Sequence, residues 1–559
     1  MEEYREIREM MKEILAVLEE DEIATGAARP RNDGIGRDAQ VGRLYGEGNG
    51  EKRIESRESK IGYTFQHKWY AFVMFEENSQ RSVGISLTET FLKKLDKGIV
   101  MRIVAGGKNF EYATNCFSKD FLMNKARELR QKAQDFLKGK ENYPVYKPLT
   151  WKEEIELGLD EEILRQVKDK GEVDFKVEIA SNDGKGRDAQ LGRLYGAMTE
   201  IVDMAQMARG YRKRILDEAG KNVATVGATL RQKVKTKIFI DRCKNMSQQL
   251  LTSLVYLYAV SPHGKTARVI RGGMAGFDKV CDITQKDISY LVEMPEKFDN
   301  AKHLMPGRYK IITGPDVTGV FAHEAFGHTQ EGDSCRVGRS CATILKKENK
   351  RVGNDYATIV NNAALFKFGK HNFGQNGSHF FDDEGQLARS HVILDKGYLQ
   401  TPMNDLLSAL LGDANGPAPR QSNGKRESWR NPIFARQTNT YFTPGDKTLD
   451  ELISMVDYGF LAEHAYGGME DPKGMGLTAG TEYLEEIKDG RLTGEVFLGP
   501  QGGHVELSDP VPMLLNGIIA KSHEQDFNIK WGGCGKYHKE YVEAGSGGTY
   551  ILWTGINCG

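Results

Sequence analysis

Residues 320–333 read VFAHEAFGHTQEGD, and within them HEAFGH places His323 and His328 five positions apart. This spacing is one residue longer than that of the H-E-x-x-H pattern, whose two histidines bind zinc from one face of a helix. Histidines four apart in an α-helix lie roughly 40° from each other, whereas histidines five apart lie roughly 140° apart. The two histidines can therefore share a metal ion only where the helix departs from regular α-helical winding.

The surrounding segment DVTGVFAHEAFGHTQEG, residues 316–332, predicts one helix. Asp316 or Thr318 can cap its start, and Gly332 can end it. This helix is the structural element on which any shared metal site would depend.

A π-bulge would solve the spacing problem, because winding from residue i to i+5 returns side chains five apart to one face. Gly327 stands directly before His328, where it relaxes the backbone. If the helix is widened here, or ends at Gly327, His323 and His328 can chelate one ion with Glu324 beside it.

Neutral imidazoles suit zinc, and a catalytic zinc lowers the pKa of its bound water. A neighbouring carboxylate such as Glu324 can take the proton of that water and give it to a leaving amine. The alternative is that both histidines are ordinary helix residues with local hydrogen bonds. A third ligand is also needed, and spacing alone does not choose among four candidates: Glu331, Cys335, Cys341 and Cys534.

The composition excludes some functions. The chain has 559 residues, enough for two to four domains, with 39% hydrophobic and 28% charged residues. Its formal net charge of -1 gives no global basic field for nucleic acid or an acidic membrane. The charged start lacks a signal-peptide core, no apolar run has membrane-spanning length, and the seven cysteines are scattered. We expect a cytoplasmic protein with reduced thiols.

The hydrophobic pattern divides the chain into three parts. Strands and a helix form a predicted N-terminal α/β domain, residues 1–141, and a linker at 142–150 opens a central α/β domain, residues 142–300. Short strands and turns then predict a β-rich C-terminal domain, residues 301–559.

Three local signals in the last part are specific. VILDKGYLQ (392–400) and YLEEIKDGRLTGEVFLG (483–499) predict hairpins, the second around Asp489-Gly490. Thr448 and Glu451 form a predicted capping box at the start of a helix.

One short repeat stands apart from this pattern. NDGIGRDAQVGRLYG at 32–46 recurs as NDGKGRDAQLGRLYG at 182–196, with 13 of 15 positions identical. It lacks the Lys-Ser/Thr pair of a phosphate-binding P-loop, so we interpret it as a duplicated surface segment.

Four motifs occur in the order found in one known family. VFAHEAFGHTQEGD resembles the H-E-x-x-x-H signature of the TldD/PmbA metalloproteases. FFDDEGQ (380–386), SNGKRESWRNPIFARQTNTYFTPGD (422–446) and GGCGKYHKE (532–540) are similar to its other conserved segments. The resemblance covers about 250 residues, and it is looser from 60 to 300.

The resemblance implies an α+β fold, with two N-terminal α/β segments followed by a β-rich C-terminal metal-binding domain. It implies zinc held by His323, His328 and Cys534, with Glu324 as general base, as in the catalytic TldD type. It also implies a dimer, either of two copies or with a metal-free paralogue. The implied substrates are flexible or unfolded peptides, bound partly as an added β-strand.

Each of the other residues in the matching motifs has two candidate roles. Glu331 and Asp333 match the family's E-G-D and are expected to orient the histidines, or else to cap a helix end. Arg426 and Asn439 line the cleft or stabilise turns. His538, where the family has D-G-Q, is a rival ligand or an orienting group.

The acidic stretch 382–384 could bind a cation, but we expect a solvated hairpin turn. Two other functions remain open beside the zinc peptidase. One is a non-catalytic partner or binding subunit whose metal is structural and closed by a fourth protein ligand, His538 or Cys335. The other is a zinc amidase that acts on modified peptides.

Overall fold

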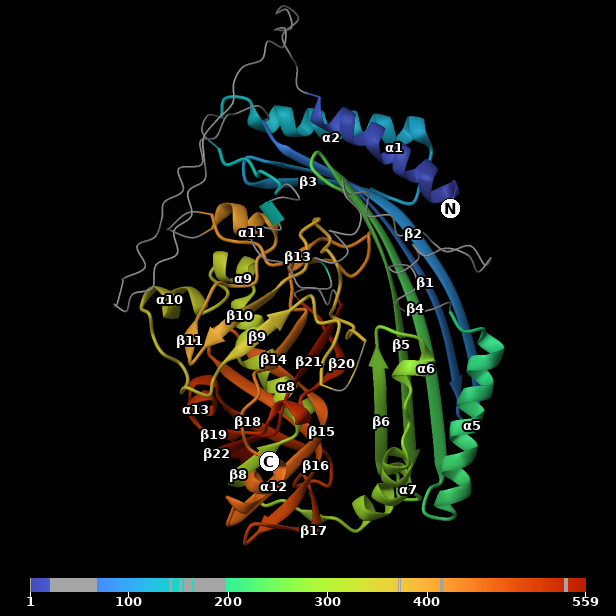
Figure 1. Cartoon of the computed structure of the whole chain (residues 1–559), viewed down its shortest axis with the longest axis vertical. Helices are drawn as coiled ribbons and strands as arrows, with labels where there is room; N and C mark the ends of the chain where they lie inside the picture. The colour runs from blue at the N-terminus through green and yellow to red at the C-terminus, as the bar shows by residue number, and fades with distance from the viewer. Residues whose placement is uncertain are drawn as a thin grey trace, which may run out of the picture.

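The computed structural model describes residues 2–20, 68–140, 143–149, 153–154, 163, 198–369, 371, 373–412, 417–536 and 541–559 (Figure 1). Both copies of the repeat and His538 lie outside these ranges. No helix in the described part of the chain is long and apolar enough to cross a membrane.

A six-stranded antiparallel sheet forms the N-terminal half, in the order β3-β2-β1-β4-β5-β6. Its strands are β1 (Tyr70–Ile85), β2 (Glu89–Ala105), β3 (Lys108–Thr114), β4 (Thr225–Asp241), β5 (Asn245–Val260) and β6 (Thr266–Gly273). Because β1 pairs with β4, the two predicted N-terminal segments each supply three strands to one sheet.

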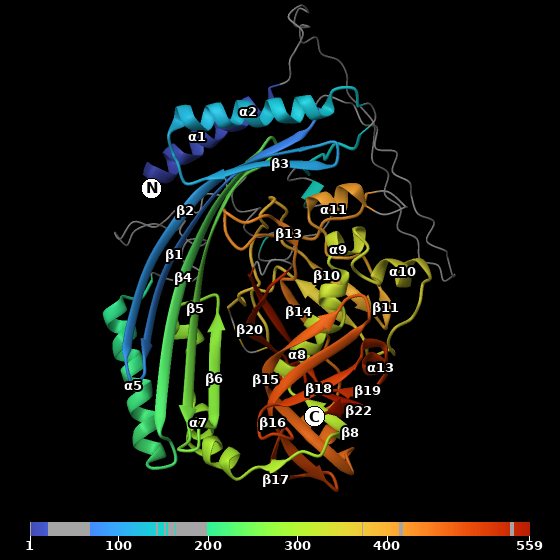
Figure 2. The ribbon, with the colours of Figure 1, turned by 180° about the vertical axis from the view of Figure 1, so that it is seen from behind.

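The sheet is covered on both faces because its long strands alternate their apolar side chains. On one face Ala71, Val73 and Phe75 pack against helices α1 and α2. On the other face Phe72 and Met74 pack against the C-terminal domain, which lies inside the curve of the sheet (Figures 1 and 2). The helices of this half are α1 (Glu2–Glu19), α2 (Lys119–Leu137), α5 (Ile201–Ala219), α6 (Phe277–Val280) and α7 (Gln285–Asp299).

The C-terminal half contains two larger sheets and one two-stranded ribbon. One sheet has the order β11-β10-β9-β14-β21-β20, from β9 (Ile359–Asn362), β10 (Ser390–Asp395), β11 (Tyr398–Leu399), β14 (Asn439–Phe442), β20 (Asn528–Cys534) and β21 (Val542–Gly548). The other has eight strands: β7 (Lys302–His303), β8 (Gly307–Thr313), β15 (Tyr458–Asp471), β16 (Gly476–Lys488), β17 (Arg491–Leu498), β18 (Val505–Pro510), β19 (Ile518–Lys521) and β22 (Ile551–Cys558). The ribbon pairs β12 (Gly424–Lys425) with β13 (Phe434–Ala435).

Short helices connect these strands, and α8 (Pro315–Ala322) contacts strands of both larger sheets. The others are α9 (Gly332–Arg336), α10 (Ala342–Lys347), α11 (Leu406–Leu411), α12 (Leu449–Ser454) and α13 (Val511–Asn516). The predicted α+β class with a β-rich C-terminal domain is confirmed.

Buried charges dock the first sheet onto the C-terminal domain. The stretch 382–384, for which we expected a solvated turn, is buried, so that expectation is wrong. Arg102 on β2 pairs with Glu384 at 2.7 Å, and Lys237 on β4 pairs with Asp383. The carboxylates stay in the interior because cations from the facing sheet reach them, which hydrophobic patterning does not reveal.

Candidate metal centre

The predicted helix is widened at the two histidines. After α8, residues His323–Gly327 form a π-helical turn, and His328–Gln330 form a 3₁₀ turn. The helix starts from Gly314 without a side-chain cap, so the predicted caps at Asp316 and Thr318 are wrong. It ends one residue before Glu331, whose backbone is extended.

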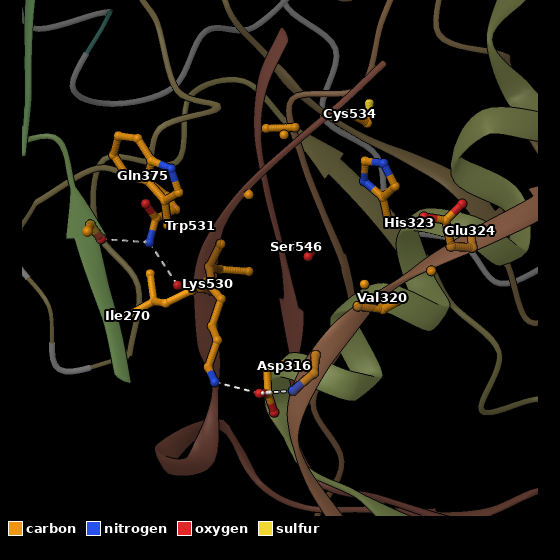
Figure 3. A pocket seen from close by; sticks show the side chains of 18 of the residues that line it. Ile270, Asp316, Val320, His323, Glu324, Gln375, Lys530, Trp531, Cys534 and Ser546 are labelled. Carbon is orange, nitrogen blue, oxygen red and sulfur yellow. Dashed lines mark hydrogen bonds and ion pairs between the residues drawn. The ribbon is translucent and has the colours of Figure 1, made fainter. Parts of the chain in front are cut away.

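The widening brings the two histidines together. Their ring centroids lie 4.8 Å apart and the rings are nearly perpendicular, at 88°. Cys534, at the end of β20, faces them, and one potential ligand atom from each of the three residues lies within 4.8 Å of the others. Figure 3 shows Cys534 next to the His323 ring, with Glu324 on the same turn.

Among the candidate third ligands, Cys534 is the one that joins this group within the described residues. The Cys335 thiol donates instead to the Thr329 carbonyl oxygen at 3.3 Å. The Glu331 carboxylate lies near Nδ1 of His328. Spacing could not make this choice, because 206 residues of sequence numbering separate His328 from Cys534 while the fold brings them into contact.

Gly327 is required for a different reason from the expected one. Its φ of -62° is available to any residue. A Cβ atom there would lie 2.1 Å from Oε1 of Gln437, so the missing side chain makes room for the glutamine. Gln437 in turn donates from Nε2 to the His323 carbonyl oxygen at 3.2 Å. This bond connects the π-turn to the loop that carries Gln437.

The electrostatics favour a thiolate at Cys534. Arg436 donates from Nη2 to the Cys534 sulfur at 2.9 Å and to its carbonyl oxygen at 2.8 Å. Burial raises the pKa of this thiol, but the two histidines and the Arg436 guanidinium outweigh burial and hold the pKa well below its ordinary value. A thiolate is the form of cysteine that binds metals.

Glu331 contacts both His328 and Lys536. Its carboxylate lies 3.3 Å from His328 Nδ1 and 2.9 Å from Lys536 Nζ. Burial raises the pKa of Glu331, but Lys536, His328 and Arg436 together lower it below the ordinary value. Asp333 touches Lys536 at 2.6 Å, and burial raises its pKa to about 6.

A cavity of about 1290 Å³ opens in front of the centre. It is lined by His323, Glu324 and Cys534, and by residues of β6, β15 and β20. Figure 3 shows Asp316 and Lys530 paired away from the histidine and Ile270 of β6 across the space.

Four polar residues of the site were missed at the sequence level: Arg436, Gln437, Lys536 and Glu470. The first three lie inside the family-like segments 422–446 and 532–540, which was the available signal. Glu470 lines the cavity and accepts from the Thr329 hydroxyl at 3.0 Å. Burial raises the pKa of Glu470 well above its ordinary value. The negative charge of the nearby Glu324 raises this pKa further, whereas the positive charge of His328 lowers it.

Two predicted cleft residues lie elsewhere. Arg426 is buried and pairs with Glu111 at 2.8 Å, and Asn439 donates to the Asn362 carbonyl oxygen at 2.8 Å. Neither belongs to the described residues that line the large cavity. Arg426 joins the C-terminal domain to β3 of the first sheet, and Asn439 joins β14 to β9.

Two histidines on a widened helix turn, a facing thiolate and an adjacent glutamate above a cavity define a candidate centre of the metallohydrolase type. Residues 306–552 match the PmbA/TldA metallopeptidase C-terminal domain. A metalloprotease of Methanocaldococcus jannaschii is 28% identical over 373 residues, 65% of this chain and 75% of its own. A zinc metalloprotease TldD homologue of Saccharolobus solfataricus is 30% identical over 246 residues, 44% of this chain and half of its own.

Solved structures share the fold. A Thermotoga maritima protein superposes with a TM-score of 0.61 at 14% identity, covering 88% of this chain and 96% of its own. TldE from Thermococcus kodakarensis gives a TM-score of 0.54 at 12% identity, with the same coverage. Residues 306–552 therefore carry the C-terminal domain of the PmbA/TldD metallopeptidase family.

Proposed function

We propose that this chain is a zinc-dependent metallopeptidase that hydrolyses flexible or unfolded peptides. One observation carries the proposal: His323, His328 and Cys534 present three ligand atoms within 4.8 Å of one another, and Glu324 stands beside them on the large cavity. One relative, from Saccharolobus solfataricus, is itself named a zinc metalloprotease.

The donor set fits zinc. Two imidazoles and one thiolate are ligands of borderline-soft character, and three protein ligands leave a position for water or substrate. When bound, zinc would supply an acidic water and polarise the scissile carbonyl. His323, His328 and Cys534 would hold the ion, and the depressed thiol pKa of Cys534 prepares that residue for it.

The remaining residues would position and move protons. Glu324, at the cavity wall, takes a proton from the attacking water and delivers it to the leaving amine. Glu331 accepts a hydrogen bond from the Nδ1–H group of His328. In this tautomer the lone pair of His328 Nε2 is available for the ion. Arg436 holds the Cys534 sulfur in place by its hydrogen bond.

Two sheet edges favour an extended peptide as substrate. β6 ends the first sheet and β20 ends the second, and residues of both line the cavity. An extended chain can add to such an edge through main-chain hydrogen bonds, largely independent of its sequence. A folded protein cannot, so we propose flexible peptides as substrates. We also propose a dimer, of two copies or with a metal-free paralogue, on the family resemblance alone.

The test is Glu324→Gln, assayed with an unstructured casein substrate and by zinc analysis. We expect zinc content and thermal stability to stay unchanged while hydrolysis falls by about 100-fold or more, because a general base is lost. Glu495→Gln, a change of the same kind on β17 away from the cavity lining, is the control. Undiminished hydrolysis by Glu324→Gln would remove this residue from the mechanism. Hydrolysis absent even from the zinc-loaded native protein would favour a non-catalytic subunit.

A further inference from the structure

A second cavity, of about 310 Å³, lies between β4 and the C-terminal domain. Alternate residues of a strand point to the same face, and on β4 four consecutive members of one such set line this cavity. They are all cationic: Arg231, Lys233, Lys235 and Lys237. Lys425, from the facing domain, adds a fifth cation.

Fewer carboxylates face these five cations. Glu543 serves two of them, with Lys233 at 3.3 Å and Lys235 at 3.7 Å. Asp383 and Glu76 both contact Lys237.

Within the described residues, Arg231 and Lys425 have no carboxylate partner. Lys425 donates to backbone carbonyl oxygens, including that of Gln437 at 3.3 Å. The Arg231 guanidinium lies 6.0 Å from the Trp531 ring centroid. Five cations thus share three carboxylates.

The other charges around this cavity are balanced, with a carboxylate for each cation. The pairs are Arg430 with Asp96, Arg426 with Glu111, and Arg420 with Asp382. Lys94 and Glu427, one charge of each sign, also line the cavity. The surplus of positive charge therefore belongs to the β4 set and Lys425.

This surplus is costly inside a protein, because buried charge without a counter-charge loses its hydration. Its effect is visible on two lysines. Burial, with the charges of Lys235 and Arg436, lowers the pKa of Lys425 to about 7. Burial also lowers the pKa of Lys233, whereas Glu543, Glu76 and Asp383 outweigh burial and raise the pKa of Lys235.

We propose that this cavity binds an oxyanion of the carboxylate or phosphate class, held by Lys425, Lys233 and Arg231. A bound anion would supply the missing counter-charge. Asn376, which also lines the cavity, donates one amide hydrogen to the Gly532 carbonyl oxygen and can donate the other to the anion. The volume suits a small anionic group, since ligand cavities start near about 300 Å³.

The position suggests where a carboxylate would come from. Trp531 lines both this cavity and the cavity of the metal centre. Lys425 donates to the carbonyl of Gln437, whose side chain binds the His323 carbonyl oxygen. The C-terminal carboxylate of a peptide is therefore one source of the anion, and this source rests on the proposed peptidase function; free phosphate is the other.

The experiment is a calorimetric titration of inorganic phosphate into the full chain at constant ionic strength. We expect saturable binding that Lys425→Met weakens about tenfold or more, the loss of one charge-assisted contact. Because Lys425 is half-buried and its replacement could disturb the local structure, Lys233→Met is titrated as well, with the same expected direction. Lys93→Met, on the exposed part of β2, is the control and should bind as the native protein does. No phosphate binding by the native protein, or equal binding by all variants, would overturn the proposal.

Competition separates the two sources. A short peptide with a free C-terminus and its C-terminal amide are added to Glu324→Gln protein with bound phosphate. Displacement by the free acid alone supports a substrate carboxylate, and displacement by neither supports free phosphate as the ligand. Phosphate binding is repeated after zinc is stripped with a chelator. If that binding persists in a protein that never hydrolyses peptides, the proposed function fails while the oxyanion site stands.

Discussion

Replacing Gly327 with alanine tests whether space, rather than backbone freedom, explains this glycine. The added Cβ would lie 2.1 Å from Gln437 Oε1, where ordinary contacts begin near 3.4 Å. Gln437 would have to retreat by about 1 Å or more. Its hydrogen bonds to the His323 carbonyl oxygen, at 3.2 Å, and from the Thr440 hydroxyl, at 2.8 Å, would be lost or stretched.

The cost follows from two contributions. Overpacking in a buried site costs about 1–3 kcal/mol. Each weakened buried hydrogen bond adds about 1 kcal/mol. Because two such bonds are affected, we expect Gly327→Ala to destabilise the C-terminal domain by about 3–5 kcal/mol, which lowers its melting temperature by roughly 10 °C or more. Zinc affinity should fall about 10-fold or more, because the turn that carries His323 loses its support.

Differential scanning calorimetry and competition with a zinc chelator measure these two effects. Gly210→Ala is the matched control, because nothing lies within 4 Å of a Cβ at this position on α5. Alanine there should leave stability unchanged or raise it slightly, since it is the better helix former. A Gly327→Ala protein with native melting temperature and zinc affinity would refute the steric explanation and return the residue to a backbone role.

Three further predictions follow from the site and its supports. Cys534→Ala should lower zinc from about one ion per chain to a weakly held fraction in elemental analysis, and undiminished zinc would exclude Cys534 as a ligand. Arg102→Ala should lower the free energy of unfolding, measured by urea denaturation, by about 3–5 kcal/mol, because it removes the cation that lies 2.7 Å from the buried Glu384. The control Arg209→Ala removes an exposed ion pair and should lower it by about 1 kcal/mol or less. Burial and the nearby Lys425 and Lys237 lower the pKa of His379 to about 3, below the roughly 6.5 of the unfolded chain. The unfolded state therefore binds one more proton than the folded state, so stability should fall as the pH drops from about 6.5 towards 3. His379→Gln should make the melting temperature fall less steeply over this pH range. An unaltered pH profile of the melting temperature would contradict this.

Local signals in the sequence were sufficient for several elements. The hairpin turn at Asp489-Gly490 has positive φ at both residues, 51° and 73°, and joins β16 to β17. The turn at Lys396-Gly397 does the same between β10 and β11. The Thr448 capping box is present with both hydrogen bonds. These features are readable because two to four adjacent residues contain all the information that they need.

The histidine spacing was also informative by itself. Two metal ligands five residues apart require a wider turn, and the structure has a π-turn at His323–Gly327. The β-rich character of the C-terminal domain was equally visible in its short alternating strands and turns. The sequence thus determined the hairpins and the fold class, and it left a widened helix or a helix end at Gly327 as the two ways in which the histidines could meet.

Tertiary structure alone decided which distant residues meet. Cys534 joins the histidines because β20 ends beside the π-turn, and Gln437 explains Gly327 because the loop between β13 and β14 approaches that turn. The buried stretch 382–384 looked like a solvated turn because its counter-charges, Arg102 and Lys237, lie on a different sheet. Such contacts depend on how sheets pack across hundreds of residues, and a short window of sequence records the residue types but not the partners that packing brings to them.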